Sequence, residues 1–186
     1  MPSFATRWPV SGRPRPKRLD YNIGFIFQTF NLFPVLTAAE NVEYPLLQME
    51  EVGKEERRER VARLLEMVQL AKFAGHRPNQ LSGGQRQRVA IARALVTQPE
   101  IVLADEPTAN LDHATGQGIL ALMKAINRKF GTTFIFSTHD QKVIDVADRL
   151  IGIEDGRVRF LGLKKDGKWL ITDERRRGPS AEAETQ

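Results

Sequence analysis

The chain has no cysteine among its 186 residues, so disulfides and thiolate metal sites are excluded. It also lacks any run of about 18 apolar residues, the length that a membrane-spanning helix needs. No apolar signal-peptide core lies near the N-terminus. With 41% hydrophobic and 27% charged residues, the composition is that of a globular protein, and the length is sufficient for one domain with a core.

Acidic residues are missing from residues 1–19, which hold five of the 28 basic residues of the chain. The other 23 basic residues equal the 23 acidic ones, so the net charge of +5 comes entirely from this leader. A solvated tail explains this distribution better than a DNA or RNA surface, and we expect no nucleic-acid partner. Four prolines in the leader predict an irregular segment over residues 1–19 and disfavour the amphipathic helix of an organellar transit peptide.

A folded domain is expected over residues 20–172, followed by a polar, flexible tail over residues 173–186. It starts with an apolar strand at residues 23–27, which are rich in β-branched and aromatic side chains. Residues 37–80 are then expected to form a mainly helical insert.

Two helices are predicted inside this insert. Thr37 and Glu40 have the spacing of a capping box, and Pro45 must end or kink the helix that they begin. A second helix is predicted over residues 54–70. Its buried stripe is Val61, Leu64, Leu65 and Val68. Its solvated side chains are Glu55, Arg57, Arg58 and Glu59.

After residue 81 the pattern changes to alternating helix and strand, which indicates an α/β fold with a parallel sheet and crossover helices. The predicted helices are 85–97, 114–129 and 141–147. The predicted strands are 101–104, 133–137 and 150–153, of which the first two are expected to be buried. Asp-Gly pairs at 155–156 and 166–167 are typical of hairpin turns and predict a small antiparallel extension.

The strongest local signal is Leu-Ser-Gly-Gly-Gln at residues 81–85, directly before a helix. Ser82 and Gln85 have capping-box spacing, and Gly83 and Gly84 allow close approach to backbone amides. A helix N-terminus with free amides binds anions, so the segment is a candidate phosphate-binding site. An ordinary capped helix after a glycine turn is the alternative.

Two further signals lie at the ends of strands. The strand at 101–104 is followed by Asp105 and Glu106, and the strand at 133–137 leads to His139. Ligands of open α/β sheets bind at the carboxyl ends of strands, where Asp105 can hold Mg²⁺ and Glu106 can polarise a water molecule. If the two strands are neighbours, His139 lies at the same edge and can orient that water or contact a phosphate.

The order of these motifs closely resembles that of ATP-binding subunits of ABC transporters, over the stretch from Gln28 to about Phe160. The resemblance implies an α/β, P-loop NTPase-like core with a parallel sheet, a helical insert and a small antiparallel extension. In chain order, the matches are the Q-loop at Gln28, the signature at residues 81–85, the Walker B strand with its glutamate at 103–107, the D-loop at 109–112 and the switch histidine at His139.

The resemblance also implies how such a subunit works. In the family, two subunits sandwich ATP, and each signature faces the ATP that the other subunit holds. Ser82, Gly83, Gly84 and Gln85 would thus contact the partner's nucleotide, and Asp112 would cross the dimer interface. Glu106 would be the general base with His139 beside it, and Asp105 and Gln28 would address Mg²⁺ and water.

The expected partners are a second ATPase subunit and a transmembrane permease, which the helical insert and the Gln28 loop would couple to hydrolysis. This places the chain in the cytoplasm, on the inner face of the membrane. The region of Gln28, residues 40–42 and residues 133–148 look most like the lipoprotein-release and macrolide-efflux group.

One family motif, the Walker A phosphate loop G-x-x-x-x-G-K-[ST], is expected upstream of Gln28, but residues 1–27 contain no Gly-Lys pair. Residues 162–168 fit G-x-x-x-x-G-K, but Trp169 follows where Ser or Thr is needed, and a hairpin explains this segment better. We therefore expect an N-terminally truncated ATPase whose autonomous activity is doubtful. The alternatives are a non-enzymatic subunit that lends its signature to a partner, a truncated gene product, and a non-transport relative that acts in repair or translation.

Overall fold

The computed structural model describes residues 22–173, which fall into two compact units that divide after Asp140. The predicted leader at 1–19 lies outside the described residues, and so does the predicted tail apart from residue 173. Within the described part, no helix combines the length and the apolar character needed to cross a bilayer.

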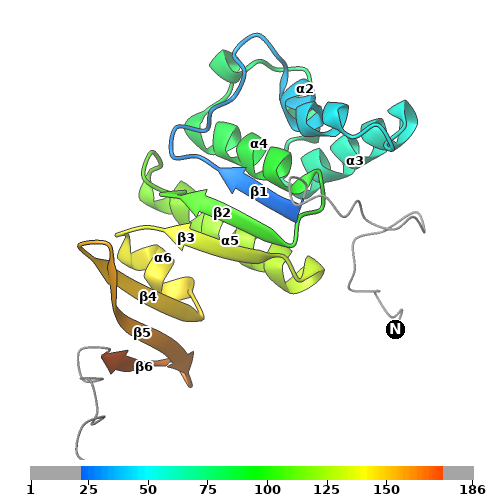
Figure 1. Cartoon of the computed structure of the whole chain (residues 1–186). Helices are drawn as coiled ribbons and strands as arrows, with labels where there is room; N and C mark the ends of the chain where they lie inside the picture. The colour runs from blue at the N-terminus through cyan, green and yellow to red at the C-terminus, as the bar shows by residue number, and fades with distance from the viewer. Residues whose placement is uncertain (1–21, 174–186) are drawn as a thin grey trace, which may run out of the picture. The chain divides into compact units, whose positions relative to one another are not determined.

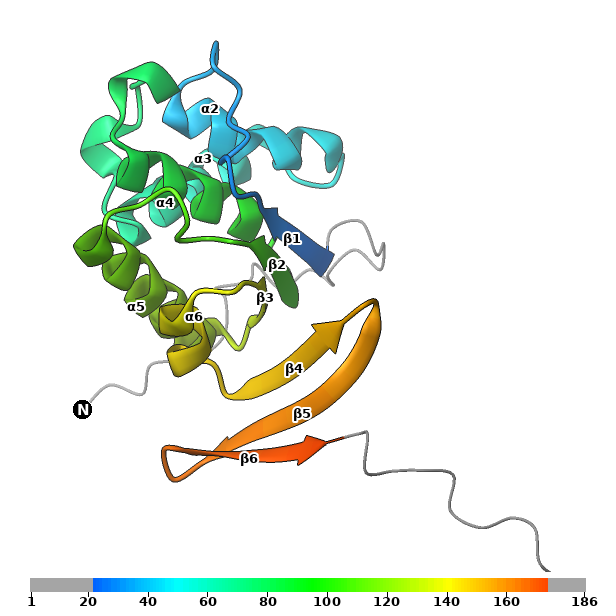
Figure 2. The ribbon, with the colours of Figure 1, turned by 90° about the vertical axis from the view of Figure 1, so that its left-hand side faces the viewer.

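The first unit contains a three-stranded parallel sheet in the order β1 (Ile23–Ile26), β2 (Ile101–Asp105) and β3 (Thr133–Ser137). Helices α4 (Gly83–Leu95) and α5 (His113–Phe130) connect these strands and lie on the same side of the sheet (Figures 1 and 2). The carboxyl ends of β2 and β3 are therefore adjacent, with Asp105 paired in register with Ser137. Glu106 and His139 are expected at the same edge if their strands are neighbours, and the strands are neighbours.

In β1 and β2 one face is buried, and in β3 every residue is at least partly accessible, which corrects the expectation of buried strands at 101–104 and 133–137. Side chains that face α4 and α5, such as Ile26, Val102 and Ala104, are buried at 0–2% exposure. Those on the other face remain accessible, with Ile23 at 43%, Phe25 at 42% and Ile135 at 51%. The physical reason is that, among the described residues of this unit, helices cover only the α4 and α5 side of the sheet.

Residues 37–80 fold into α2 (Ala38–Glu43), the 3₁₀ helix η1 (Tyr44–Gln48), α3 (Lys54–Met67) and the 3₁₀ helices η2 (Ala71–Phe73) and η3 (Pro78–Gln80). Thr37 and Glu40 form the predicted capping box, and α2 ends at Glu43, two residues before Pro45. Both α2 and α3 pack against α4. The insert is thereby attached to the helix that follows the Leu-Ser-Gly-Gly-Gln motif.

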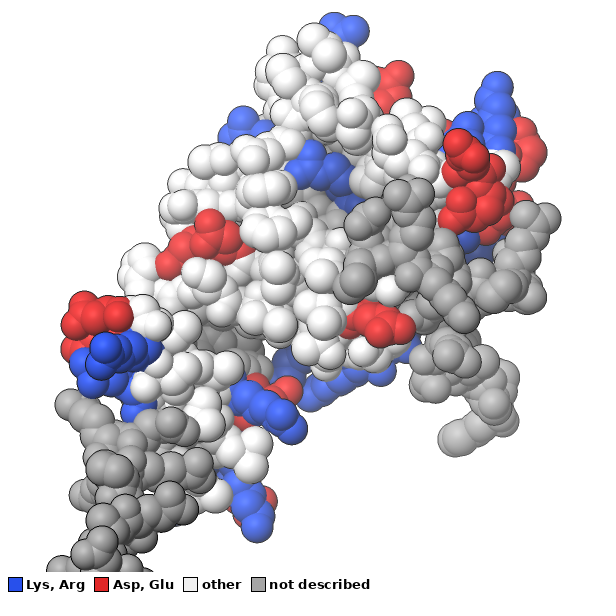
Figure 3. All heavy atoms as spheres, in the orientation of Figure 1, with Lys and Arg blue, Asp and Glu red and all other residues white. Residues whose placement is uncertain are grey.

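Helix α3 buries its predicted stripe, since Val61, Leu64, Leu65 and Val68 are all at most 6% exposed. The opposite face carries interleaved acidic and basic side chains, which Figure 3 shows at the upper right, where Figure 1 places α3. Its ion pairs are Arg58–Glu55, Arg60–Glu56 and Arg63–Glu59. Arg57 differs from the prediction of a solvated residue, because its guanidinium is half-buried and bonds Glu43 Oε1 and the Val52 carbonyl.

The second unit contains α6 (Gln141–Val146) and an antiparallel meander of β4 (Arg149–Glu154), β5 (Arg157–Lys165) and β6 (Lys168–Asp173). The predicted hairpins are present: both residues of each Asp-Gly pair adopt positive φ, at 50° and 71° for 155–156 and at 51° and 75° for 166–167. The strand predicted at 150–153 is β4, which pairs antiparallel with β5 and does not extend the parallel sheet.

Candidate functional site

The Leu-Ser-Gly-Gly-Gln motif forms the start of α4. Ser82 is the N-cap and accepts a hydrogen bond from the Gln85 amide at 3.3 Å, while Gln85 Oε1 accepts one from the Ser82 amide at 2.8 Å. The helix begins at Gly83, two residues earlier than predicted, so both glycines belong to its first turn. Their amides lie at the end of the helix where the positive end of its dipole favours an anion.

The two glycines differ in their surroundings. A Cβ at Gly84 would lie 2.4 Å from Cγ2 of Thr115, whereas a Cβ at Gly83 would meet its nearest atoms, in Asn110 and Leu111, at 3.6 Å. Gly84 is therefore required by the packing of α4 against α5. The sequence motif suggested only close approach of an external group, and this internal contact is an additional reason for the residue.

Glu106 and His139 are brought together as the sequence predicted. Nδ1 of His139 lies 2.5 Å from Oε1 of Glu106, and the His139 backbone amide donates to the same oxygen at 3.1 Å. The Thr138 hydroxyl donates to the other oxygen, Oε2, at 2.9 Å. The Glu106 side chain is only 15% exposed, whereas that of His139 is 90% exposed. A fixed carboxylate thus lies beside an imidazole that reaches solvent.

Asp105 ends β2 and is partly buried. Within residues 22–173, no cluster of three or more His, Asp or Glu side chains could enclose a metal ion. Mg²⁺ is commonly held by one or two carboxylates together with substrate phosphates and water, so a single strand-end aspartate fits that ion. The donor set is therefore compatible with Mg²⁺ that arrives with a nucleotide.

Gln28 is exposed and follows β1, and its position is linked to the D-loop match at 109–112. Asn110 Nδ2 donates to the Gln28 carbonyl at 2.8 Å. The Asn110 carbonyl also lies against Gly83. Asn110 therefore connects the Gln28 loop with the start of α4.

Asp112 is the N-cap of α5. Its carboxylate accepts hydrogen bonds from the Thr115 hydroxyl at 2.6 Å and from the Thr115 amide at 3.0 Å. These bonds, the hydroxyl bond first, hold the pKa of Asp112 below its usual range. The residue expected at the dimer interface thus has a structural role within its own chain as well.

Sequence reasoning missed two residues that position Glu106. Thr138 directly precedes His139, and only the fold shows that its hydroxyl reaches Glu106. Gln87 is 1% exposed, and its Nε2 donates to the Pro107 carbonyl at 2.8 Å, which ties α4 to the turn after Glu106. The signal for Gln87 was present, because this polar residue interrupts the apolar stripe of Ala90, Ile91 and Ala94 on α4.

The G-x-x-x-x-G-K match at 162–168 is a hairpin, as preferred from the sequence. It runs from β5 into β6, and Gly167 adopts a φ of 75° in the turn between them. Gly162 lies against the Trp169 ring, where a Cβ would be 3.3 Å from Cε3. Up to residue 173, where the description ends, the segment continues as strand β6 and not as a helix that could present amides to a phosphate.

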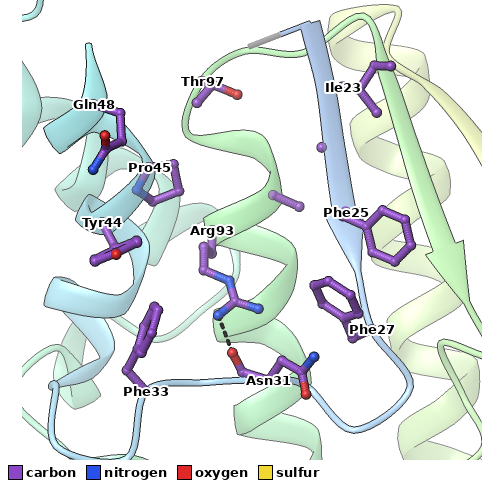
Figure 4. A pocket seen from close by; sticks show the side chains of 12 residues that line it. Ile23, Phe25, Phe27, Asn31, Phe33, Tyr44, Pro45, Gln48, Arg93 and Thr97 are labelled. Atoms are coloured by element: carbon purple, nitrogen blue, oxygen red, sulfur yellow. Dashed lines mark hydrogen bonds between the residues drawn. The ribbon is translucent and has the colours of Figure 1, made fainter. Parts of the chain in front are cut away.

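A pocket of about 540 Å³ lies in the first unit, between β1, the loop after it, η1 and α4 (Figure 4). Apolar side chains dominate its lining, with Phe25, Phe27, Phe33 and Tyr44 among them. Arg93 extends from α4 into the same lining and contacts Asn31.

Known proteins with similar sequence share this arrangement of elements. A sequence model described as ABC transporter matches residues 9–109, more than half of the chain. The uncharacterized ABC transporter ATP-binding protein MJ0796 of Methanocaldococcus jannaschii is 52% identical over 139 residues, which are 73% of this chain and 59% of that protein. The macrolide export ATP-binding/permease protein MacB of Rhodopirellula baltica is 49% identical over 139 residues, 74% of this chain and 20% of that protein.

Among solved structures, the dimeric post-hydrolysis state of the MJ0796 cassette bound to ADP and Pi matches with a TM-score of 0.67 and 50% identity. This match covers 76% of the present chain and 62% of that one, so the chain spans less than two thirds of these relatives. The α/β fold, with its parallel sheet and small antiparallel sheet, is that of an ABC ATPase cassette. The chain belongs to the ABC transporter family.

Proposed function

We propose that the chain is an ATP-binding and ATP-hydrolysing subunit of an ABC transport system and that it acts as a dimer. The observation that carries this proposal is the Glu106 carboxylate, held by Thr138 and His139 at the carboxyl ends of adjacent parallel strands. A carboxylate oriented in this way, beside an imidazole that reaches solvent, suits proton abstraction from an attacking water molecule. The dimeric relative bound to ADP and Pi supports the same chemistry.

In this proposal each site residue has one task. Glu106 accepts the proton of the attacking water, and His139 orients that water or contacts the terminal phosphate. Asp105 and Gln28 hold Mg²⁺ and water, and the ion would supply charge neutralisation at the phosphates. Ser82, Gly83, Gly84 and Gln85 bind the terminal phosphate of ATP held by the partner subunit, and Asp112 lies at the interface between the two subunits.

The ATP site beside Glu106 also needs a phosphate loop, and none of the 186 residues matches G-x-x-x-x-G-K-[ST]. We propose that turnover depends on a phosphate loop outside these residues. The same observation favours an alternative function, in which the chain contributes its signature to ATP bound by a complete partner and does not hydrolyse ATP at its own Glu106.

We further propose that the chain serves a membrane permease on the cytoplasmic side of the membrane and belongs to the lipoprotein-release and macrolide-efflux group. The similarity to MacB, which is an ATP-binding/permease protein, supports both points. The apolar pocket beside the Gln28 loop is the proposed contact for the permease, because Phe33 and Tyr44 offer it an accessible aromatic surface.

Nucleotide titration and phosphate release, measured on the chain alone and on the chain mixed with a complete ABC ATPase, test the proposal. Hydrolysis that depends on Glu106 is expected only when the mixture also contains a separate phosphate-loop segment, because the loop of the complete partner holds the partner's own ATP; Glu106→Gln should then abolish the part that the chain's own site adds. Ser82→Ala should instead remove activation of the partner's site. If Glu106→Gln changes nothing while Ser82→Ala removes the activation, the alternative holds. If neither substitution has an effect, both functions are wrong.

A further inference from the structure

The loop that follows Gln28 contains an unusual backbone turn. Phe30 and Asn31 have φ values of 65° and 46°, in the left-handed region that non-glycine residues rarely occupy. Two local backbone bonds close the turn, from the Phe30 amide to the Phe27 carbonyl at 3.1 Å and from the Asn31 amide to the Thr29 carbonyl at 2.8 Å. The Thr29 hydroxyl adds a third local bond, to Oδ1 of Asn31 at 2.9 Å. A strained turn of this kind persists when the surrounding structure holds it.

Arg93 of α4 provides such an external hold. Its Nη1 donates to the Asn31 carbonyl at 2.5 Å, and its Nη2 donates to the Phe30 carbonyl at 2.8 Å. Figure 4 shows the guanidinium directed from α4 toward Asn31 across the lining of the pocket. One planar group thus bonds both carbonyls of the turn, a geometry that the fork of arginine permits and the single ammonium of lysine does not reproduce.

Two other contacts tie this loop to the body of the unit. Asn110 holds the Gln28 carbonyl itself, and the Arg86 guanidinium lies over the Phe30 ring at 5.4 Å from its centroid. The segment from Gln28 to Asn31 is therefore fixed at its start by Asn110 and at its end by α4. Arg93 makes the two hydrogen bonds at that end.

We propose that Arg93 is a positioning residue, which sets the place of the Gln28 side chain by holding the Phe30–Asn31 turn against the signature helix α4. The importance of this placement rests on the role proposed for Gln28 at the metal and water. Because Ser82 caps the start of α4 and Arg93 lies about three turns later on the same helix, α4 fixes both the signature and the Gln28 loop.

The absence of cysteine makes this proposal directly measurable, since Thr29→Cys creates one attachment site for a nitroxide spin label. Thr29 is exposed and lies within the turn, so the label reports on the mobility of the loop by electron paramagnetic resonance. Its own hydroxyl bond to Asn31 is lost in every labelled variant alike, so differences between the spectra report on the other substitution. Arg93→Lys and Arg93→Ala should each convert the slow spectral component into a fast one. Arg88→Ala is the matched control, because Arg88 lies on the same helix but bonds the Val68 carbonyl.

A chemical rescue separates a positioning role from a general loss of packing. The pocket beside Arg93 opens to small solutes, so ethylguanidinium should restore the slow component in Arg93→Ala, whereas ethylammonium should not. The proposal is overturned if both Arg93 variants keep the slow component, if Arg88→Ala mobilises the label equally, or if the two solutes act alike. If Arg93→Ala does not fold, the spectrum of Arg93→Lys is compared with that of Arg88→Lys. Only Arg93→Lys should then lose the slow component.

These spectra need no nucleotide, so their outcome is independent of whether the chain hydrolyses ATP. If the label responds to Arg93 as expected but Gln28→Ala leaves the Mg²⁺ dependence of turnover in the mixed assay unchanged, the proposed role of Gln28 fails while the hold of Arg93 on the loop stands.

Discussion

At the scale of single residues, Glu106 shows how a functional side chain is fixed in an unfavourable backbone conformation. Its φ of 41° lies in the left-handed region, and its carboxylate is bonded by two neighbours from the end of β3. The Thr138 hydroxyl has two tasks, since it also accepts a hydrogen bond from the Asp140 amide at 3.0 Å.

Thr138→Val should therefore lower the free energy of unfolding by about 1 to 2 kcal/mol, because a largely buried charged acceptor loses its donor. Urea denaturation measures this loss, and turnover in the mixed assay should fall with it. Thr138→Ser is the control, since it keeps the hydroxyl. Equal stability of the Val and Ser variants would show that this bond contributes nothing.

Gly84 allows an equally local prediction. Alanine at this position places Cβ within 2.4 Å of the Thr115 methyl, so Gly84→Ala should destabilise by about 1 to 3 kcal/mol despite the better helix propensity of alanine. Gly83→Ala, with its nearest contacts at 3.6 Å, should be neutral or slightly stabilising. Adding Thr115→Ser removes the clashing methyl and should restore Gly84→Ala in a double-mutant cycle; purely additive effects would contradict the contact.

At the scale of secondary-structure elements, helix caps give stability a pH dependence. The pKa of Asp112 at the start of α5 is held below its usual range by the Thr115 bonds, and the pKa of Glu40 in α2 is lowered by its bonds from Thr37. The folded-state pKa of each carboxyl lies below its pKa in the unfolded chain. At pH values between the two, the unfolded chain therefore binds more protons than the folded one. The stabilisation is complete above about pH 5 and is lost as the pH falls through the folded values.

Asp112→Asn isolates one of these contributions, since asparagine still caps a helix but does not titrate in this range. The stability difference between the native chain and this variant should be largest near neutral pH and should shrink as the pH falls below about 4. Chemical denaturation at a series of pH values measures it. A difference that stays constant with pH would mean that the Asp112 carboxyl has no lowered pKa.

At the scale of the whole molecule, apolar surface remains accessible in each unit. In the first unit it lies on the sheet face opposite α4 and α5, and in the second it includes Ile151, Ile153 and Leu163, each at least 50% exposed. Parallel sheets are normally covered on both faces. Exposed apolar patches of this kind tend to associate with other protein surfaces.

The isolated chain should therefore self-associate with increasing concentration, as measured by sedimentation velocity. Phe25→Ser combined with Ile135→Ser should reduce the association because both side chains lie on the accessible sheet face. Val102→Ala serves as the contrast: it lies on the covered face and should lower stability by about 1 to 3 kcal/mol without reducing association. A native chain that stays monomeric at every concentration would refute the prediction.

The family, most of the elements and the order of the motifs follow from the amino-acid sequence. Capping boxes at Thr37 and Ser82, the Asp-Gly turns and the stripe of α3 depend on neighbours within a few residues, so they can be derived from local spacing. The meeting of Glu106 with His139 was also predictable, because adjacent parallel strands bring their carboxyl ends to one edge.

The contacts that hold those motifs in place are visible only in the folded chain. The bonds from Arg93 to Phe30 and Asn31 join residues more than 60 positions apart, and Gly84 meets Thr115 only because α4 packs on α5. Likewise β4 pairs with β5, although its place in the alternating pattern suggested the parallel sheet. Local pattern specifies the type of an element, whereas its neighbours depend on how the whole chain buries its apolar faces, and for that reason the residues that position Gln28 and Glu106 could be identified only in the folded protein.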